Sequence, residues 1–222
     1  MTASFFTIDD HDIAFLKDQW DDLVSFYISD RFIKENLFEI LKTRYSEKSR
    51  FYHNLSHVKA LLHLFESHPA KIQKPAAIRF SIWFHDVVYD TKRNDNEEES
   101  ANMASETLGQ LQVGIETIEL VRESILATKG HSGAHLPEDA KLFLDMDLAI
   151  LGMKEETYTQ YSKAVRAEYS WVPESQYRKS RRNILKSFID RERIYFTDKM
   201  KAKFEEQARK NIHGEIESLG DQ

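Results

Sequence analysis

Two residues of the kind that bind metal ions stand side by side in an apolar stretch of the chain. His85 and Asp86 lie between Ile82-Trp83-Phe84 and Val87-Val88. An ionised carboxylate is expensive to remove from water unless its charge is compensated. A divalent cation would compensate both residues, because carboxylate oxygens and neutral imidazole nitrogens are ligands for Zn, Mn and Fe. The alternative is a core histidine hydrogen-bonded to its neighbour, and further ligands elsewhere would decide between the two.

Further candidate ligands precede and follow this pair. His53 and His57 are four residues apart, a spacing that puts two side chains on one face of a helix. Asp145 and Asp147 interrupt the apolar run 140–152, and residues two apart on a helix point to different faces. We therefore expect one of these aspartates to reach a site and the other to cap a helix or pair with another group.

Four of these isolated polar residues make up a chemically consistent ligand set: His57, His85, Asp86 and Asp147. Two imidazoles and two carboxylates suit one divalent ion and leave coordination positions open for water and substrate, as catalysis requires. The charges of one dication and two carboxylates cancel. A site of this composition therefore does not repel an anionic phosphate.

The order and spacing of these residues resemble the H…HD…D signature of the HD superfamily of metal-dependent phosphohydrolases, an all-helical fold. Longer matches, which cover nearly the whole chain, are similar to a bacterial group of predicted HD-type phosphohydrolases whose pattern specifies no substrate. They are Tyr52-His53-Asn54-Leu55-x-His57, Phe84-His85-Asp86-x-Val88-Tyr89-Asp90, Asn96-Glu97-Glu98-x-Ser100-Ala101, Asp145-x-Asp147-Leu148-Ala149-Ile150-Leu151-Gly152, Arg166-x-Glu168-Tyr169 and Ala208-Arg209-x-Asn211.

The resemblance implies roles for the residues of the first group. His57, His85, Asp86 and Asp147 would be the metal ligands. His53 would be the general acid for the leaving alkoxide, and an imidazole suits that role because its ordinary pKa lies near pH 7.

Position and chemistry add further site candidates. Glu97 and Glu98 follow the His-Asp stretch and could orient the attacking water; the alternative is that these acids only favour the start of a helix. Arg50, just before the first motif, is the candidate for clamping a phosphate. His131 is a second candidate for contact with the substrate.

The number of metal ions is a separate question. Tyr52-His53-Asn54-x-x-His57 also resembles the cyclic nucleotide phosphodiesterases, which carry a further His directly after the His-Asp pair, whereas this chain has Val87. The departure argues against cyclic nucleotides as the substrate and against a complete two-metal site, although His131 or His135 could supply another ligand. We expect one divalent transition metal, which could be Mn, Fe, Co, Ni or Zn, with two ions as the alternative.

Composition and periodicity predict an all-α protein with one domain over residues 1–222. The chain has only 7 Gly, 4 Pro and no Cys, and helix-favouring residues are frequent. Helices are expected to begin near Asp10, Phe32, Leu55, Pro75, Glu97 and Ile115, and to cover about 140–152, 155–171, 174–191 and 197–219. The helix from Pro75 is expected to be central and to continue into His85 and Asp86. The resemblance implies that the fold is an HD-domain helical bundle, with its metal-site core at about 50–152 and additional C-terminal helices at about 155–219.

The overall charge and the N-terminus restrict the classes of partner. A net charge of −6 and a pI near 5.9 argue against a nucleic-acid-binding surface. Because neither a secretory signal nor a bilayer-spanning apolar run is apparent, we expect a cytoplasmic protein that works without a membrane.

The expected activity is metal-dependent hydrolysis of a small phosphorylated substrate, a phosphomonoester or phosphodiester of a nucleotide or metabolite. Two alternatives are a di-iron oxygenase on the same fold and a non-catalytic interaction module. The charged C-terminal helices leave a homodimer open.

Overall fold

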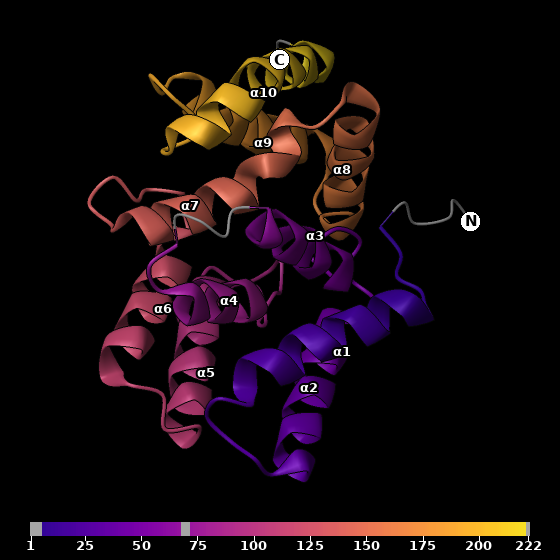
Figure 1. Ribbon diagram of the computed structural model, residues 1–222. Helices are drawn as coiled ribbons and strands as arrows, with labels where there is room; N and C mark the ends of the chain where they lie inside the picture. Colours follow the sequence, from indigo (N-terminus) through magenta and orange to yellow (C-terminus); the bar gives the residue numbers. More distant parts are fainter. Residues whose placement is uncertain (1–5, 68–71, 221–222) are drawn as a thin grey trace. The chain divides into compact units, whose positions relative to one another are not determined.

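The computed structural model describes residues 6–67 and 72–220, and every regular element within these ranges is helical (Figure 1). The all-α prediction is therefore confirmed. None of the described helices is long and apolar enough to cross a membrane. The elements are α1 (Asp10–Val24), α2 (Arg31–Tyr45), α3 (Leu55–Glu66), α4 (Pro75–Phe84), α5 (Asn96–Gln110), α6 (Ile115–Ala127), α7 (Glu138–Asp147), the 3-10 helix η2 (Leu148–Gly152), α8 (Glu155–Glu168), α9 (Glu174–Ile189) and α10 (Asp198–Leu219).

Local capping chemistry explains why several helices start where the sequence predicts. Asp9 and Asp12 form a reciprocal capping box at the start of α1. The side chain of Asp30 accepts hydrogen bonds from the first backbone N–H groups of α2. Asn54 caps α3 by accepting from the backbone N–H of Ser56 at 2.9 Å.

Internal contacts divide the chain into two compact units, residues 1–143 and residues 144–222. The boundary falls inside α7, which is one uninterrupted helix. The organisation as a single domain stays a prediction.

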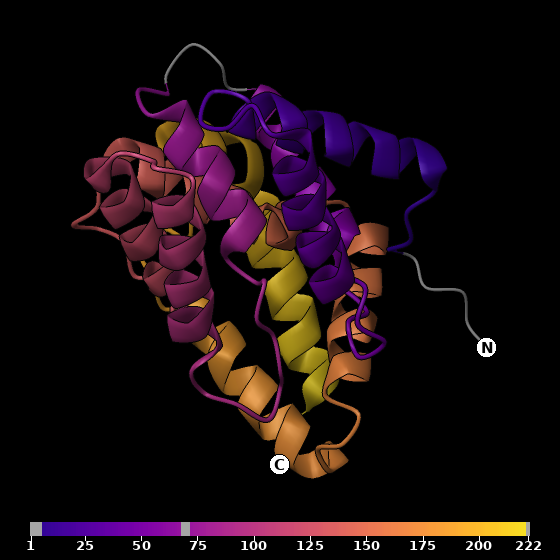
Figure 2. The same ribbon diagram turned by 90° about the horizontal axis from the view of Figure 1, so that it is seen from below.

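The first unit is built around α4. This helix packs against α3, α5 and α6, and α5 and α6 lie side by side in both views of the chain (Figure 1 and Figure 2). Seven of the ten residues of α4 are buried. Trp83 on this helix meets the rings of Trp20 and Phe38 edge-on, with centroids 5.5 and 6.2 Å away. The prediction of a central, buried helix is confirmed.

The second unit is organised around α10, which packs against α9 and η2. The contact with η2 depends on Gly152, because a Cβ at this position would lie 2.6 Å from the backbone oxygen of Phe204. Asn211 on α10 donates to the carbonyls of Leu151 and Met153, both at 2.8 Å. The Leu148–Gly152 motif is thus held to α10 by hydrogen bonds from the Asn211 side chain to main-chain carbonyls and by the absence of a side chain at Gly152.

Candidate metal centre

The first turn of α3 positions His57. Asn54 is the N-cap, and His57 is the third residue of the helix. The residue is 3 % exposed, so its imidazole is buried. Tyr52, just before the cap, packs against the His57 ring with centroids 4.9 Å apart.

The end of α4 positions His85 and Asp86. The helix stops at Phe84, His85 is its C-cap, and Asp86 lies in the turn that follows. The prediction that both residues lie within a helix is therefore wrong. The side chain of Asp86 is 19 % exposed, whereas that of His85 is buried. The chain leaves the helix because the backbone of Val88 exchanges hydrogen bonds with the hydroxyl of Ser100 instead of continuing the helical ladder.

The two buried imidazoles point their Nε2 atoms at each other. Nε2 of His57 lies 3.1 Å from Nε2 of His85. Nδ1 of His85 lies 3.0 Å from the carbonyl oxygen of Ile82. A carbonyl only accepts, so Nδ1 carries the proton and Nε2 of the neutral ring presents a lone pair. This second hydrogen bond fixes both the tautomer and the ring orientation, as is usual for a histidine that binds a metal.

A carboxylate approaches the same nitrogen. Oδ2 of Asp86 lies 3.1 Å from Nε2 of His85. A bare imidazole nitrogen and an ionised carboxylate are both acceptors, so their approach requires a positive charge between or beside them. Either a proton on Nε2 or a metal cation supplies that charge. The donor set of imidazole and carboxylate fits a divalent ion.

Helix α7 brings a further carboxylate. Its residue Phe143 meets the ring of His85 edge-on, with centroids 5.7 Å apart. Asp147 is one turn further along the same helix and so shares the face of Phe143. Among the described residues, His57, His85 and Asp147 form a group in which one ligand atom of each lies within 4.8 Å of the others. Three of the four expected ligands therefore come together, and Asp86 adjoins them through His85.

Comparisons of the chain with protein-family models, curated proteins and solved structures found no match. The HD-type resemblance therefore stays an interpretation of the motifs.

Asp145 has a different task from Asp147. Its buried carboxylate accepts hydrogen bonds from the backbone N–H groups of Phe196 and Thr197, at 2.6 and 2.7 Å, and from the hydroxyl of Thr197. It thereby stabilises the N-terminus of α10, where a negative charge is favourable. Burial raises the pKa of Asp145 above its ordinary value, although these hydrogen bonds oppose the shift.

Substituting each aspartate by asparagine should separate these two roles. We expect Asp145→Asn to destabilise the protein by about 1–3 kcal/mol, because its amide group would face N–H donors. Asp147→Asn should leave the midpoint of thermal unfolding nearly unchanged and lower the affinity for metal. Circular dichroism and metal titration of both variants check this. Equal metal affinity in Asp147→Asn and the wild type would remove Asp147 from the ligand set.

His53 lies at the edge of the same cluster. Its ring stacks on Tyr89 with centroids 4.3 Å apart and an interplanar angle of 27°. Tyr52 meets it edge-on, and the ring of His57 is 6.1 Å away between centroids. The side chain is partly exposed. A proton donor at this position can therefore meet a molecule that enters from solvent.

Arg50 has a position that the sequence does not predict. Its side chain is completely buried. The guanidinium donates to the main-chain carbonyls of His53, Asp86 and Val87, and Nε donates to Glu47. These bonds occupy the guanidinium within the protein, so we no longer assign Arg50 to substrate phosphate.

The other site candidates lie outside the ligand group. Glu97 and Glu98 are in the first turn of α5. The hydrogen bond from Lys129, 2.6 Å long, lowers the pKa of Glu98 and ties α5 to the end of α6. His131 lies in the loop between α6 and α7 with a left-handed backbone, and His135 is exposed in the same loop. None of these four residues belongs to the His57–His85–Asp147 group.

The sequence did not identify two aromatic residues, Tyr89 and Phe143, as neighbours of the site histidines. Tyr89 supports His53, and Phe143 lies against His85. Tyr89 stands within a recognised motif, three residues after Asp86, so its position could have been noticed. Phe143 is one of many apolar residues in α7, and only the folded chain distinguishes it.

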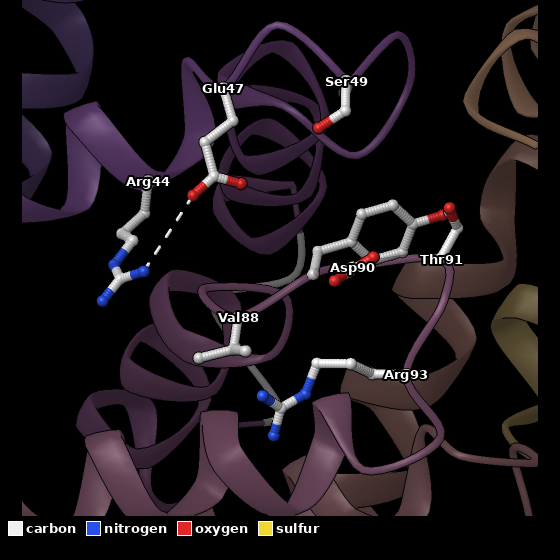
Figure 3. A pocket seen from close by; sticks show the side chains of 8 residues that line it. Arg44, Glu47, Ser49, Val88, Asp90, Thr91 and Arg93 are labelled. Atoms are coloured by element: carbon white, nitrogen blue, oxygen red, sulfur yellow. Dashed lines mark ion pairs between the residues drawn. The ribbon is translucent and has the colours of Figure 1, made fainter.

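A small pocket lies along the segment that follows Asp86. Its volume is about 420 Å³, and Arg44, Glu47 and Ser49 lie across it from residues 88–91 and Arg93 (Figure 3). Arg44 pairs with Glu47 at 4.0 Å, and Arg93 binds Asp95 through two nitrogens. Because acidic neighbours match both arginines, the pocket has no excess of positive charge that would mark a phosphate site.

Proposed function

We propose that the chain is a metal-dependent phosphohydrolase that cleaves a phosphomonoester or phosphodiester of a nucleotide or small metabolite. The observation that carries the proposal is the convergence of two buried Nε2 atoms, those of His57 and His85, 3.1 Å apart, beside a carboxylate. Two imidazoles aimed at one point are well suited to a shared cation. The order of the motifs supports phosphoryl chemistry.

The residues present fit a divalent transition ion. His57, His85 and Asp147 would hold it, with Asp86 beside His85. Mixed nitrogen and oxygen ligands accommodate Mn, Fe, Co, Ni or Zn. When bound, such an ion polarises a phosphoryl oxygen and lowers the pKa of the attacking water.

His53 is the proposed proton donor. Stacking on Tyr89 and the edge contact with Tyr52 restrict its ring. In the reaction, the oxygen of water bonds to phosphorus and the ester P–O bond breaks. The leaving oxygen takes a proton from protonated His53, the attacking water releases a proton to solvent, and solvent reprotonates His53.

The oxygenase alternative needs more ligands than the cluster offers. A di-iron centre would require further histidines beside the three grouped residues. His57, His85 and Asp147 come together, which suits a single ion. We therefore propose hydrolysis as the function and keep oxidation as the alternative.

Metal reconstitution tests the proposal. The purified protein is stripped with a chelator, supplied in turn with Mn, Fe, Co, Ni or Zn, and assayed on an aryl phosphomonoester, a bis-aryl phosphodiester and a panel of nucleotides. We expect metal uptake and hydrolysis that depends on the added ion. Absence of uptake would indicate that a proton joins the two imidazoles, and uptake without hydrolysis of any phosphate ester would refute the phosphohydrolase assignment.

A further inference from the structure

One buried guanidinium connects the two turns that carry the candidate site. Arg50 lies between α2 and α3, and its side chain has no exposed surface. Its Nη1 donates both to the carbonyl of His53, at 3.1 Å, and to the carbonyl of Asp86, at 2.6 Å. A single nitrogen thus joins the turn before α3 to the turn after α4. Nη2 donates to the carbonyl of Val87 at 3.1 Å and extends the link along the second turn.

The location explains why a cation is favourable here. The C-terminal end of a helix carries partial negative charge, and a buried carbonyl outside a regular helix needs a donor from elsewhere. The carbonyls of Asp86 and Val87 lie just beyond the end of α4. A charged donor forms shorter and stronger hydrogen bonds than a neutral one, which agrees with the 2.6 Å contact to Asp86.

Aromatic contacts give Arg50 a second connection to His53. Its guanidinium carbon lies 5.1 Å from the ring centroid of Tyr45 and 5.4 Å from that of Tyr89. Tyr89 in turn stacks on the ring of His53. Arg50 therefore reaches His53 through the main chain and through a tyrosine side chain.

We propose that Arg50 is a positioning residue that sets the separation between His53 and the His85–Asp86 turn. The proposal rests on the proposed function, because the geometry it describes is that of the proposed metal centre. Lysine cannot replace arginine here. An ammonium has one nitrogen, whereas the planar guanidinium reaches several carbonyls at once and lies flat against aromatic rings.

The test compares Arg50→Lys with Arg79→Lys. Arg79 is a matched control because it is also largely buried in the first unit and donates to a main-chain carbonyl, that of Gln19, and to Asp22. Both partners of Arg79 lie on α1, which carries none of the site histidines. Arg50→Gln, which keeps an amide donor, is the second variant if Arg50→Lys does not fold.

Three measurements are made on the whole 222-residue chain. Imidazole ¹⁵N–¹H spectra are recorded in the presence of chelator, so that they report the site without metal or turnover. Metal affinity is measured second, and the kcat and KM of hydrolysis are measured third. We expect Arg50→Lys to shift the ring resonances of His53 and His85, and to lower metal affinity or kcat by about 10–100-fold, as loss of a supporting contact typically does. KM should change less than kcat, because Arg50 does not contact substrate.

The control decides between positioning and general stability. Both variants should lower the unfolding temperature, but Arg79→Lys should leave the site resonances and kcat at wild-type values. Equal effects of the two variants on the site would overturn the proposal, as would unchanged His53 and His85 resonances in Arg50→Lys. A wild-type protein without hydrolytic activity would refute the proposed function, whereas the metal-free spectra would still test Arg50.

Discussion

Replacing His85 by alanine should abolish metal-dependent hydrolysis, with a loss of about 1000-fold or more. The ring supplies an Nε2 atom 3.1 Å from that of His57, and its Nδ1 is fixed by the carbonyl of Ile82. Alanine removes both the ligand and the group that orients it. The measurements are metal content per chain after reconstitution and the initial rate of hydrolysis.

His63→Ala is the matched control for this substitution. His63 lies on α3, the helix that carries His57, but its side chain is 55 % exposed and its ring stacks on Phe15. The control should retain metal and activity. His85→Gln, which preserves much of the buried volume, shows whether lost activity follows from the missing ligand or from unfolding. Full activity in a folded His85→Ala protein would place the catalytic centre elsewhere.

The helices were predictable because their signals are local. Capping residues such as Asp9, Asp30 and Asn54 act within a few positions of themselves. Apolar spacing is likewise readable along the chain. The start of α4 follows the same rule, since Pro75 is its first residue.

The end of α4 was not predictable for the opposite reason. The apolar run continues through Val87 and Val88, and no Gly or Pro marks a stop. The helix ends because groups distant in the sequence form hydrogen bonds with the backbone that follows it. The hydroxyl of Ser100 accepts from the N–H of Val88, and Arg50 donates to the carbonyls of Asp86 and Val87. A site in a turn rather than in a helix interior also leaves Asp86 partly accessible to solvent.

For the candidate site, too, the sequence indicates which residue types could take part but not where each side chain lies. Imidazoles and carboxylates in apolar surroundings are few, so His57, His85 and Asp147 could be selected from the sequence. Basic residues number 31, and nothing in the sequence distinguishes a buried Arg50 from an exposed one. Chemistry alone suggested a phosphate clamp, whereas the folded chain directs the guanidinium at carbonyl oxygens.

The second unit contains a buried ionic network that no motif indicated. Arg181 forms a two-point contact with Glu215, with Nε–Oε1 and Nη2–Oε2 distances of 2.9 and 3.2 Å. The hydroxyls of Tyr158 and Ser162 also donate to this carboxylate. Both charged side chains are less than a tenth exposed. Burial alone would raise the pKa of Glu215, but the hydrogen bonds and the charge of Arg181 outweigh it and lower that pKa.

Arg181→Met should destabilise the protein by about 3–5 kcal/mol at pH 7, because it leaves the Glu215 carboxylate buried without its cation. For a chain of this length, each kcal/mol lowers the unfolding temperature by about 2–4 °C. Thermal unfolding followed by circular dichroism measures the effect. The matched control is Lys210→Met, which removes an exposed ion pair with Glu206 on the same helix α10 and should change little.

The pH dependence of Arg181→Met separates loss of a charge partner from loss of packing. In the wild type the pKa of Glu215 is lowered, so its contribution to stability is present above the unfolded-state pKa and is lost as the pH falls through the folded-state value. In the variant burial remains without the cation, so the pKa should be raised and stability should fall as the pH rises through it. The difference in stability between the two proteins should therefore grow from about pH 4 to pH 7. A difference that stays constant over this interval would assign the loss to packing of the arginine side chain and not to an uncompensated carboxylate.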